Sequence, residues 1–115
     1  MRVELDIFSG RPNPSWQMSA EEAAEFLHRI RSLPKTENPS DEGGLGYRGF
    51  VISNSEKLAG VPPEIRVYNG VLSINEDGTV NYYKDIEGVE RLLLRQARNH
   101  DYGDLVSGVA EIENQ

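Results

Sequence analysis

The sequence predicts a single α+β domain, in which an antiparallel sheet of four to five strands carries two helices packed on one face. Three features predict this class: short segments that alternate apolar and polar residues, two longer segments with apolar residues at helical spacing, and turn-forming residues between them. The expected order is β-α-β-β-β-α, with a final strand as an open alternative. With that last strand and one long central hairpin, the topology would approach a ferredoxin-like split βαβ fold.

The first strand is predicted over residues 2–8, where Val3, Leu5 and Ile7 alternate with polar residues. This alternation is typical of a strand that has one face in the core and the other in solvent. A proline-rich loop follows the strand. Proline fixes its own φ and restricts the residue before it, so we expect this loop to be stiff.

The first helix is predicted to begin after Ser19, because Ser19 and Glu22 form the Ser-x-x-Glu pattern of a capping box. Apolar residues then recur at helical spacing, and Pro34 ends the pattern. The expected buried side consists of Ala23, Phe26, Leu27, Ile30 and Leu33. On the exposed side, Glu25 and Arg29 have the spacing of an i,i+4 ion pair.

Residues 47–53 are predicted as a strand in which Gly49 marks a bulge or a close backbone approach. Three further alternating segments cover residues 65–68, 71–74 and 79–83. Asn69-Gly70 between the first two is a strong signal for a two-residue hairpin turn. We prefer a three-strand meander here. The alternative is a single hairpin whose first strand is bulged at Asn69-Gly70.

The second helix is predicted after Asp85, whose carboxylate can cap its first turn. Its expected buried side consists of Ile86, Val89, Leu92, Leu93 and Ala97, broadened by Leu94. Residues 101–115 are acidic and contain no lysine or arginine. They are expected to form either a frayed tail or a weak last strand built from Leu105, Val106, Val109 and Ile112.

Composition excludes several classes of site. The chain has 115 residues and a net charge of -7, and it contains no cysteine. Disulfides and thiolate metal sites are therefore excluded, and nucleic-acid binding is disfavoured because the basic residues are outnumbered and scattered. No segment has the length of a membrane span, and the first residues lack the apolar stretch of a signal peptide. We expect a cytoplasmic protein without a membrane association.

Two segments concentrate the candidate binding residues. The 9–16 loop contains Arg11, Asn13 and Trp16. Arg11 offers a fork of donors for a carboxylate, a phosphate or backbone carbonyls, or it fastens the loop to the domain. Asn13 either contacts a ligand or satisfies local backbone groups. Trp16 is either a stacking platform or, by the preferred interpretation, a cover over the end of the core.

The second segment covers residues 43–50, where three glycines lead into Tyr47 and Arg48. A phosphate-binding loop is disfavoured here because the glycines precede a predicted strand rather than a helix. Tyr47 and Arg48 could extend a site that begins at Arg11. No catalytic, metal-ligating or cofactor-binding motif stands out, so the site residues are assigned to ligand or partner binding alone.

We therefore expect a non-catalytic binding or protein-interaction module that uses the 9–16 loop and the 43–50 segment. Its partner would be a protein or a small anionic or polar ligand, and a homodimer is compatible with the sequence. One alternative is a small enzyme or biosynthetic accessory protein with a carboxylate base such as Asp6. Another is an acidic immunity or antitoxin-like protein that masks a basic partner.

Overall fold

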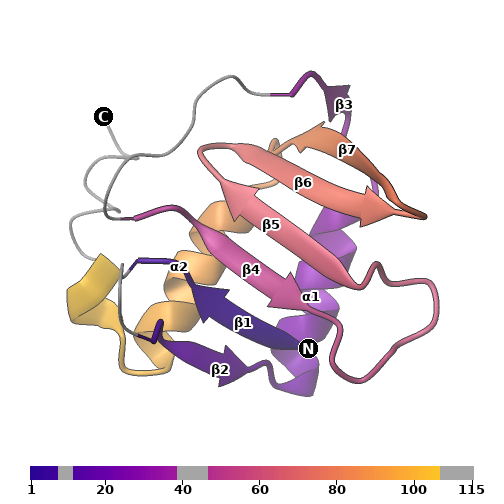
Figure 1. The fold of residues 1–115 in the computed structure, drawn as a ribbon. Coiled ribbons are helices and arrows are strands. Elements are labelled where there is room, and N and C mark those ends of the chain that lie inside the picture. The colour runs from indigo at the N-terminus through magenta and orange to yellow at the C-terminus, as the bar shows by residue number, and fades with distance from the viewer. Residues whose placement is uncertain (8–11, 39–46, 107–115) are drawn as a thin grey trace.

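The computed structural model describes residues 1–7, 12–38 and 47–106. Within these residues, the strands are β1 Arg2–Leu5, β2 Ser15–Gln17, β3 Lys35–Thr36, β4 Phe50–Ser53, β5 Glu64–Tyr68, β6 Val71–Glu76 and β7 Thr79–Lys84. They form one seven-stranded antiparallel sheet in the order β2-β1-β4-β5-β6-β7-β3 (Figure 1). The helices are α1 Ala20–Ile30 and α2 Val89–Asn99, and both lie behind the sheet in Figure 1.

The predicted sheet of four to five strands is wrong, because two short edge strands join the five that were expected. In β2, Trp16 pairs with Val3 of β1, and in β3, Lys35 pairs with Tyr83 of β7. Strands of two or three residues are too short to show a period of two in the sequence. The ferredoxin-like alternative is also wrong, since every neighbouring pair of strands in the described sheet is antiparallel.

The three-strand meander is confirmed, and the predicted Asn69-Gly70 turn connects its first two strands. Asn69 and Gly70 have φ angles of 52° and 79°, which matches a two-residue turn with positive φ at both positions. Asp77 and Gly78, with φ angles of 53° and 84°, connect β6 to β7 in the same way. Because β4 also pairs with β5, these hairpins extend into a continuous run of four strands, β4-β5-β6-β7.

The first helix begins as the capping box predicts. The Glu22 backbone N–H donates to Ser19 Oγ at 3.1 Å, and the Ser19 N–H donates to Glu22 Oε1 at 2.9 Å. Phe26 is fully buried, and Arg29 forms the expected ion pair with Glu25 at 3.0 Å. The helix ends at Ile30, before the proline that breaks the apolar pattern.

Asp85 caps the second helix, but the helix begins later than expected. The Asp85 carboxylate accepts the N–H groups of Val89 at 2.7 Å and of Glu90 at 2.9 Å. Gly88 precedes the first helical residue with a left-handed φ of 71°. Ile86 therefore lies outside the helix and is 59% exposed, so its predicted burial is wrong.

One buried core fills the space between the sheet and the helices. The sheet contributes Val3, Leu5, Phe50, Ile52, Ile65, Val67, Leu72 and Ile74, and the helices contribute Phe26, Val89, Leu92, Leu93, Leu94 and Ala97. Because these residues alternate along the strands, the polar residues between them point to the opposite face of the sheet. That opposite face has no helix over it among the described residues (Figure 1).

The last described residues differ from the predicted strand. Residues 103–106 are helical, so Leu105 and Val106 do not extend the sheet, and Val106 is buried in the core. Val109 and Ile112 lie outside the described residues. Within the part of the chain that the structure describes, no helix is long and apolar enough to cross a membrane.

Candidate functional site

Both predicted segments are hydrogen-bonded to the end of β1. On one side, the Leu5 N–H donates to the Pro14 carbonyl at 2.9 Å. On the other side, the Asp6 N–H donates to the Gly49 carbonyl, and the Arg48 N–H donates to the Asp6 carbonyl, at 2.9 and 2.8 Å. The described parts of the 9–16 loop and the 43–50 segment therefore flank the same strand end, which lies at the left in Figure 1.

Asn13 fastens its loop to this strand end. Its Oδ1 accepts the Ile7 N–H at 3.1 Å, and its Nδ2 donates to Glu4 Oε2 at 3.1 Å. These contacts are the local backbone and side-chain bonds that one interpretation of Asn13 expects. Arg11, the other polar candidate of this loop, lies outside the described residues, as do Gly43, Gly44 and Gly46 of the second segment.

Trp16 lies in the core. Its position in β2 directs it to the helix-covered face, where its ring stacks on His100 at a centroid distance of 5.4 Å and an interplanar angle of 16°. Tyr102 and Phe50 contact the ring at 5.8 and 6.2 Å, and its Nε1–H donates to Gln96 Oε1 at 3.3 Å. This arrangement agrees with the preferred interpretation of Trp16 as a cover over the core.

Arg48 forms part of a three-residue charge cluster with Asp6 and Arg66, hereafter the Arg48–Asp6–Arg66 cluster. Arg48 Nη2 donates to Asp6 Oδ1 at 3.1 Å, and Arg66 Nη1 donates to Asp6 Oδ2 at 3.2 Å. The Asp6 side chain is 11% exposed, whereas the side chains of Arg48 and Arg66 are 45% and 46% exposed. A buried carboxylate thus holds two accessible guanidinium groups side by side.

The cluster carries a net positive charge on an acidic protein. Two guanidinium charges and one carboxylate charge sum to +1, while the whole chain carries -7. Each guanidinium group has five N–H donors, and the bond to Asp6 engages one nitrogen of each. Both Asp6 oxygens accept guanidinium hydrogens, and an ionised carboxylate has acceptor sites beyond these two bonds.

Gly49 brings Arg48 next to β5. Its φ is +88°, and a Cβ at this position would lie 2.0 Å from the Val67 carbonyl oxygen and 2.7 Å from Tyr68 Cβ. No side chain fits at such distances, so the predicted close backbone approach at Gly49 is confirmed.

Arg66 completes the cluster from β5, and we did not predict it as a site residue. It alternates with buried Ile65 and Val67, which places it on the uncovered face, and it pairs with Val51 of β4. The alternation in the sequence indicates the face of the sheet to which the Arg66 side chain points. The signal for its partner was missing, because the register between β4 and β5 is a long-range property.

Tyr47, which precedes Arg48 in the chain, contacts the first turn of α2. Its Oη donates to Glu90 Oε2, and its ring lies 5.8 Å from the ring of Tyr68, two residues beyond Arg66. Glu90 is buried, and its Oε1 also accepts the Gly70 N–H at 3.0 Å. The Tyr47 hydroxyl is thereby engaged within the protein, and its ring also packs against buried Phe50 at a centroid distance of 6.0 Å.

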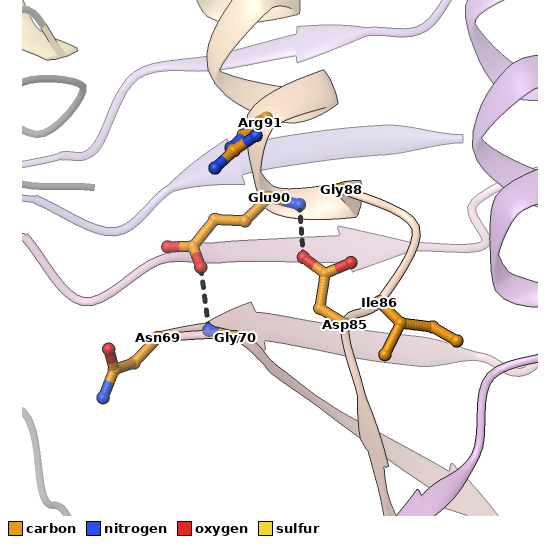
Figure 2. A pocket seen from close by; sticks show the side chains of 7 residues that line it. All are labelled: Asn69, Gly70, Asp85, Ile86, Gly88, Glu90 and Arg91. Carbon is orange, nitrogen blue, oxygen red and sulfur yellow. Dashed lines mark hydrogen bonds between the residues drawn. The ribbon is translucent and has the colours of Figure 1, made fainter. Parts of the chain in front are cut away.

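A polar pocket of about 420 Å³ lies beside this contact. Its lining consists of Asn69, Gly70, Asp85, Ile86, Gly88, Glu90 and Arg91. Figure 2 shows the Glu90 carboxylate directed at the Gly70 backbone and the Asp85 carboxylate directed at the Glu90 backbone nitrogen. Both acids thus satisfy backbone N–H groups of the hairpin turn and the helix start, which is a structural role.

A wider groove of about 950 Å³ lies at the opposite end of the sheet, between α1, residues 58–63 and the β6–β7 turn. Its lining is largely apolar and includes Leu27, Ile30 and Leu58. Neither predicted binding segment contributes to it.

No group of three or more histidine, cysteine or acidic side chains is placed to hold a metal ion within the described residues. A scan of family models, a search of curated proteins and a search of solved structures each found no match. The function of the site is therefore argued from its geometry. Its contacts within the protein do not account for two half-exposed arginines at one carboxylate.

Proposed function

We propose that this protein is a non-catalytic interaction module that binds its partner at the end of the sheet where the 9–16 loop and the 43–50 segment flank β1. The partner is a protein, or a small anionic or polar ligand. Arg48 and Arg66 supply the polar contacts, and Tyr47 and Tyr68 adjoin them. Asn13 holds the loop in place. Arg11 lies outside the described residues and remains a candidate contact from the sequence alone.

The observation that carries this proposal is the second arginine at Asp6. One guanidinium group is enough to neutralise a buried carboxylate and to satisfy it with hydrogen bonds. Arg48 and Arg66 instead share Asp6, and both side chains remain about half exposed. Since one arginine already neutralises Asp6, the second adds only a pair with a half-exposed guanidinium group, which contributes about 1 kcal/mol to stability, so stability alone is a weak reason to position both groups. Fixed, accessible donors are what a polar recognition surface requires.

The test compares Arg48→Ala and Arg66→Ala with Arg95→Ala, which removes an exposed arginine from α2. Immobilised wild-type protein would be used to capture partners from an extract of the source organism, and each captured protein would then be purified and titrated calorimetrically. We expect each cluster variant to weaken binding about tenfold or more, equivalent to about 1.4 kcal/mol, and Arg95→Ala to bind like the wild type. Arg11→Ala is expected to behave like the cluster variants.

Unfolding by urea serves as the control for stability. The cluster variants should unfold within about 1 kcal/mol of the wild type, since the remaining arginine still neutralises Asp6. A variant that unfolds several kcal/mol earlier, without a separate binding defect, would show that the arginine is structural. A basic partner whose binding is lost in salt and unaffected by Arg48→Ala would instead support the masking alternative.

A further inference from the structure

We infer, on the basis of the interaction role proposed above, that the Arg48–Asp6–Arg66 cluster receives a carboxylate group of the partner in preference to a phosphate. An arginine pair can bind either of these oxyanions, the planar carboxylate or the tetrahedral phosphate. Charge, geometry and the neighbouring residues of the cluster each favour the carboxylate.

The charge of the cluster matches a single negative charge. Asp6 already neutralises one of the two guanidinium groups, which leaves an excess of +1. A carboxylate brings the site to zero, whereas a phosphate group carries about -1.5 to -2 at neutral pH and would leave it negative. The protein around the site has a net charge of -7, so an uncompensated negative charge would also be repelled by the rest of the molecule.

The geometry of the cluster already accommodates one carboxylate. Asp6 bridges the two guanidinium groups with one oxygen on each, at 3.1 and 3.2 Å. The forks of Arg48 and Arg66 are planar, both side chains are about half exposed, and each guanidinium group has N–H donors beyond the nitrogen that is bonded to Asp6. A second carboxylate, on the solvent side, would bridge the two guanidinium groups in the way that Asp6 bridges them from the protein side.

Neighbouring residues provide contact for the chain that bears the carboxylate. Tyr68 follows Arg66 on the same face of β5, and Val51 of β4 pairs with Arg66 across the sheet. Both are partly buried and partly accessible. An acidic group next to apolar or aromatic atoms therefore fits this surface better than a free inorganic ion does.

The inference is tested by titrating isotope-labelled protein and following the arginine Nε–Hε signals by NMR. The probes are sodium acetate, sodium phosphate and sodium chloride at equal ionic strength. We expect acetate to shift the signals of Arg48 and Arg66 saturably, phosphate to bind about fivefold or more weakly, and chloride to cause no saturable shift. Arg66→Ala should weaken acetate binding about tenfold, and Arg95→Ala should leave it unchanged.

Three short peptides identify the source of the carboxylate. One carries an internal glutamate with blocked ends, one has a free C-terminal carboxylate and no acidic side chain, and one has glutamine with blocked ends. The inference requires that at least one of the first two bind more tightly than acetate and that the glutamine peptide not bind. Tighter binding of the glutamate peptide identifies an acidic side chain, and tighter binding of the second identifies a chain terminus.

Removing the Asp6 charge should reverse the preference. In Asp6→Asn the cluster carries +2, so phosphate binding should strengthen about tenfold relative to acetate, with folding checked in the same spectra. Phosphate binding as tightly as acetate in the wild type, or shifts that persist in an Arg48→Ala/Arg66→Ala double variant, would overturn the inference. If the captured partner still depends on Arg48 and Arg66 in that case, the interaction role stands and only the carboxylate assignment fails.

Discussion

At Gly49, just before β4, the backbone approaches β5 more closely than any side chain allows. The positive φ of +88° alone would cost an L-residue about 1–2 kcal/mol. The Val67 carbonyl oxygen adds a steric clash, since a Cβ would lie 2.0 Å from it. We therefore predict that Gly49→Ala lowers the free energy of unfolding by about 3 kcal/mol or more, measured by urea denaturation.

Gly60 provides a matched control for this prediction. Its φ is +76°, but no atom lies within 4 Å of the position that a Cβ would occupy. Gly60→Ala should therefore show only the cost of the left-handed conformation, about 1 kcal/mol. Equal losses in the two variants would show that the contact with β5 is not the source of the effect at Gly49.

At the scale of single elements, the capping of α2 depends on one carboxylate that lies outside the helix. Asp85 accepts two backbone N–H groups of the first turn. Gly88, which directly precedes the helix, has no side chain that could accept them. We predict that Asp85→Ala destabilises the protein by about 1–2 kcal/mol in urea denaturation. Asp85→Asn keeps one amide oxygen as an acceptor and should recover part of this loss.

The cap of α1 provides a reference for the loss of stability expected in Asp85→Ala. Ser19→Ala removes a single side-chain acceptor from a helix of the same length and should cost about 1 kcal/mol. If Asp85→Ala unfolds at the same urea concentration as the wild type, the α2 cap contributes nothing measurable. The helix start would then depend on the packing of its buried leucines alone.

These elements show which parts of the fold the sequence predicts. The capping box at Ser19 and the Asn69-Gly70 turn were predicted correctly because each signal lies within four residues of chain. The edge strands β2 and β3 were missed because pairing with β1 and β7, rather than their own pattern, makes them strands. Ile86 was misplaced because Gly88 delays the helix, although its apolar side chain fits the helical period.

At the scale of the whole molecule, the candidate site depends on contacts between residues far apart in the sequence. Arg66 is separated from Asp6 by 60 positions, and Arg48 by 42. The sequence predicted that Arg48 is a candidate, and the alternation of residues 65–68 indicated the direction of Arg66. It could not predict that both reach one carboxylate, because this requires the order β1-β4-β5 and the close backbone approach at Gly49.

A second long-range contact joins the two helices to β2. His100, just after α2, stacks on Trp16 of β2, and its Nε2 lies 3.1 and 3.2 Å from the carboxylate oxygens of Glu22 in α1. Burial raises the pKa of Glu22, but hydrogen bonds from the Ser19 backbone and from His100, together with the charge of His100, outweigh this effect. The pKa of Glu22 is therefore held below its usual value of 4.5.

This lowered pKa predicts how stability depends on acid pH. A carboxylate whose pKa is depressed in the folded protein stabilises it above the unfolded pKa of 4.5, and the stabilisation is lost as the pH falls through the folded value. Glu22→Gln removes the charge but keeps an oxygen for the capping box. In urea denaturation, we expect the wild type to exceed Glu22→Gln by about 1 kcal/mol near pH 5.5. The difference should shrink steadily toward about pH 3, because Glu22 of the wild type and the glutamine of the variant are then both neutral.

Glu21→Gln, at an exposed neighbour in the same turn, serves as the control, because it reports the general effect of losing a carboxylate near the helix start. A difference between the wild type and Glu22→Gln that stays constant over this range would contradict the assignment of the acid-sensitive stability to the Glu22–His100 contact.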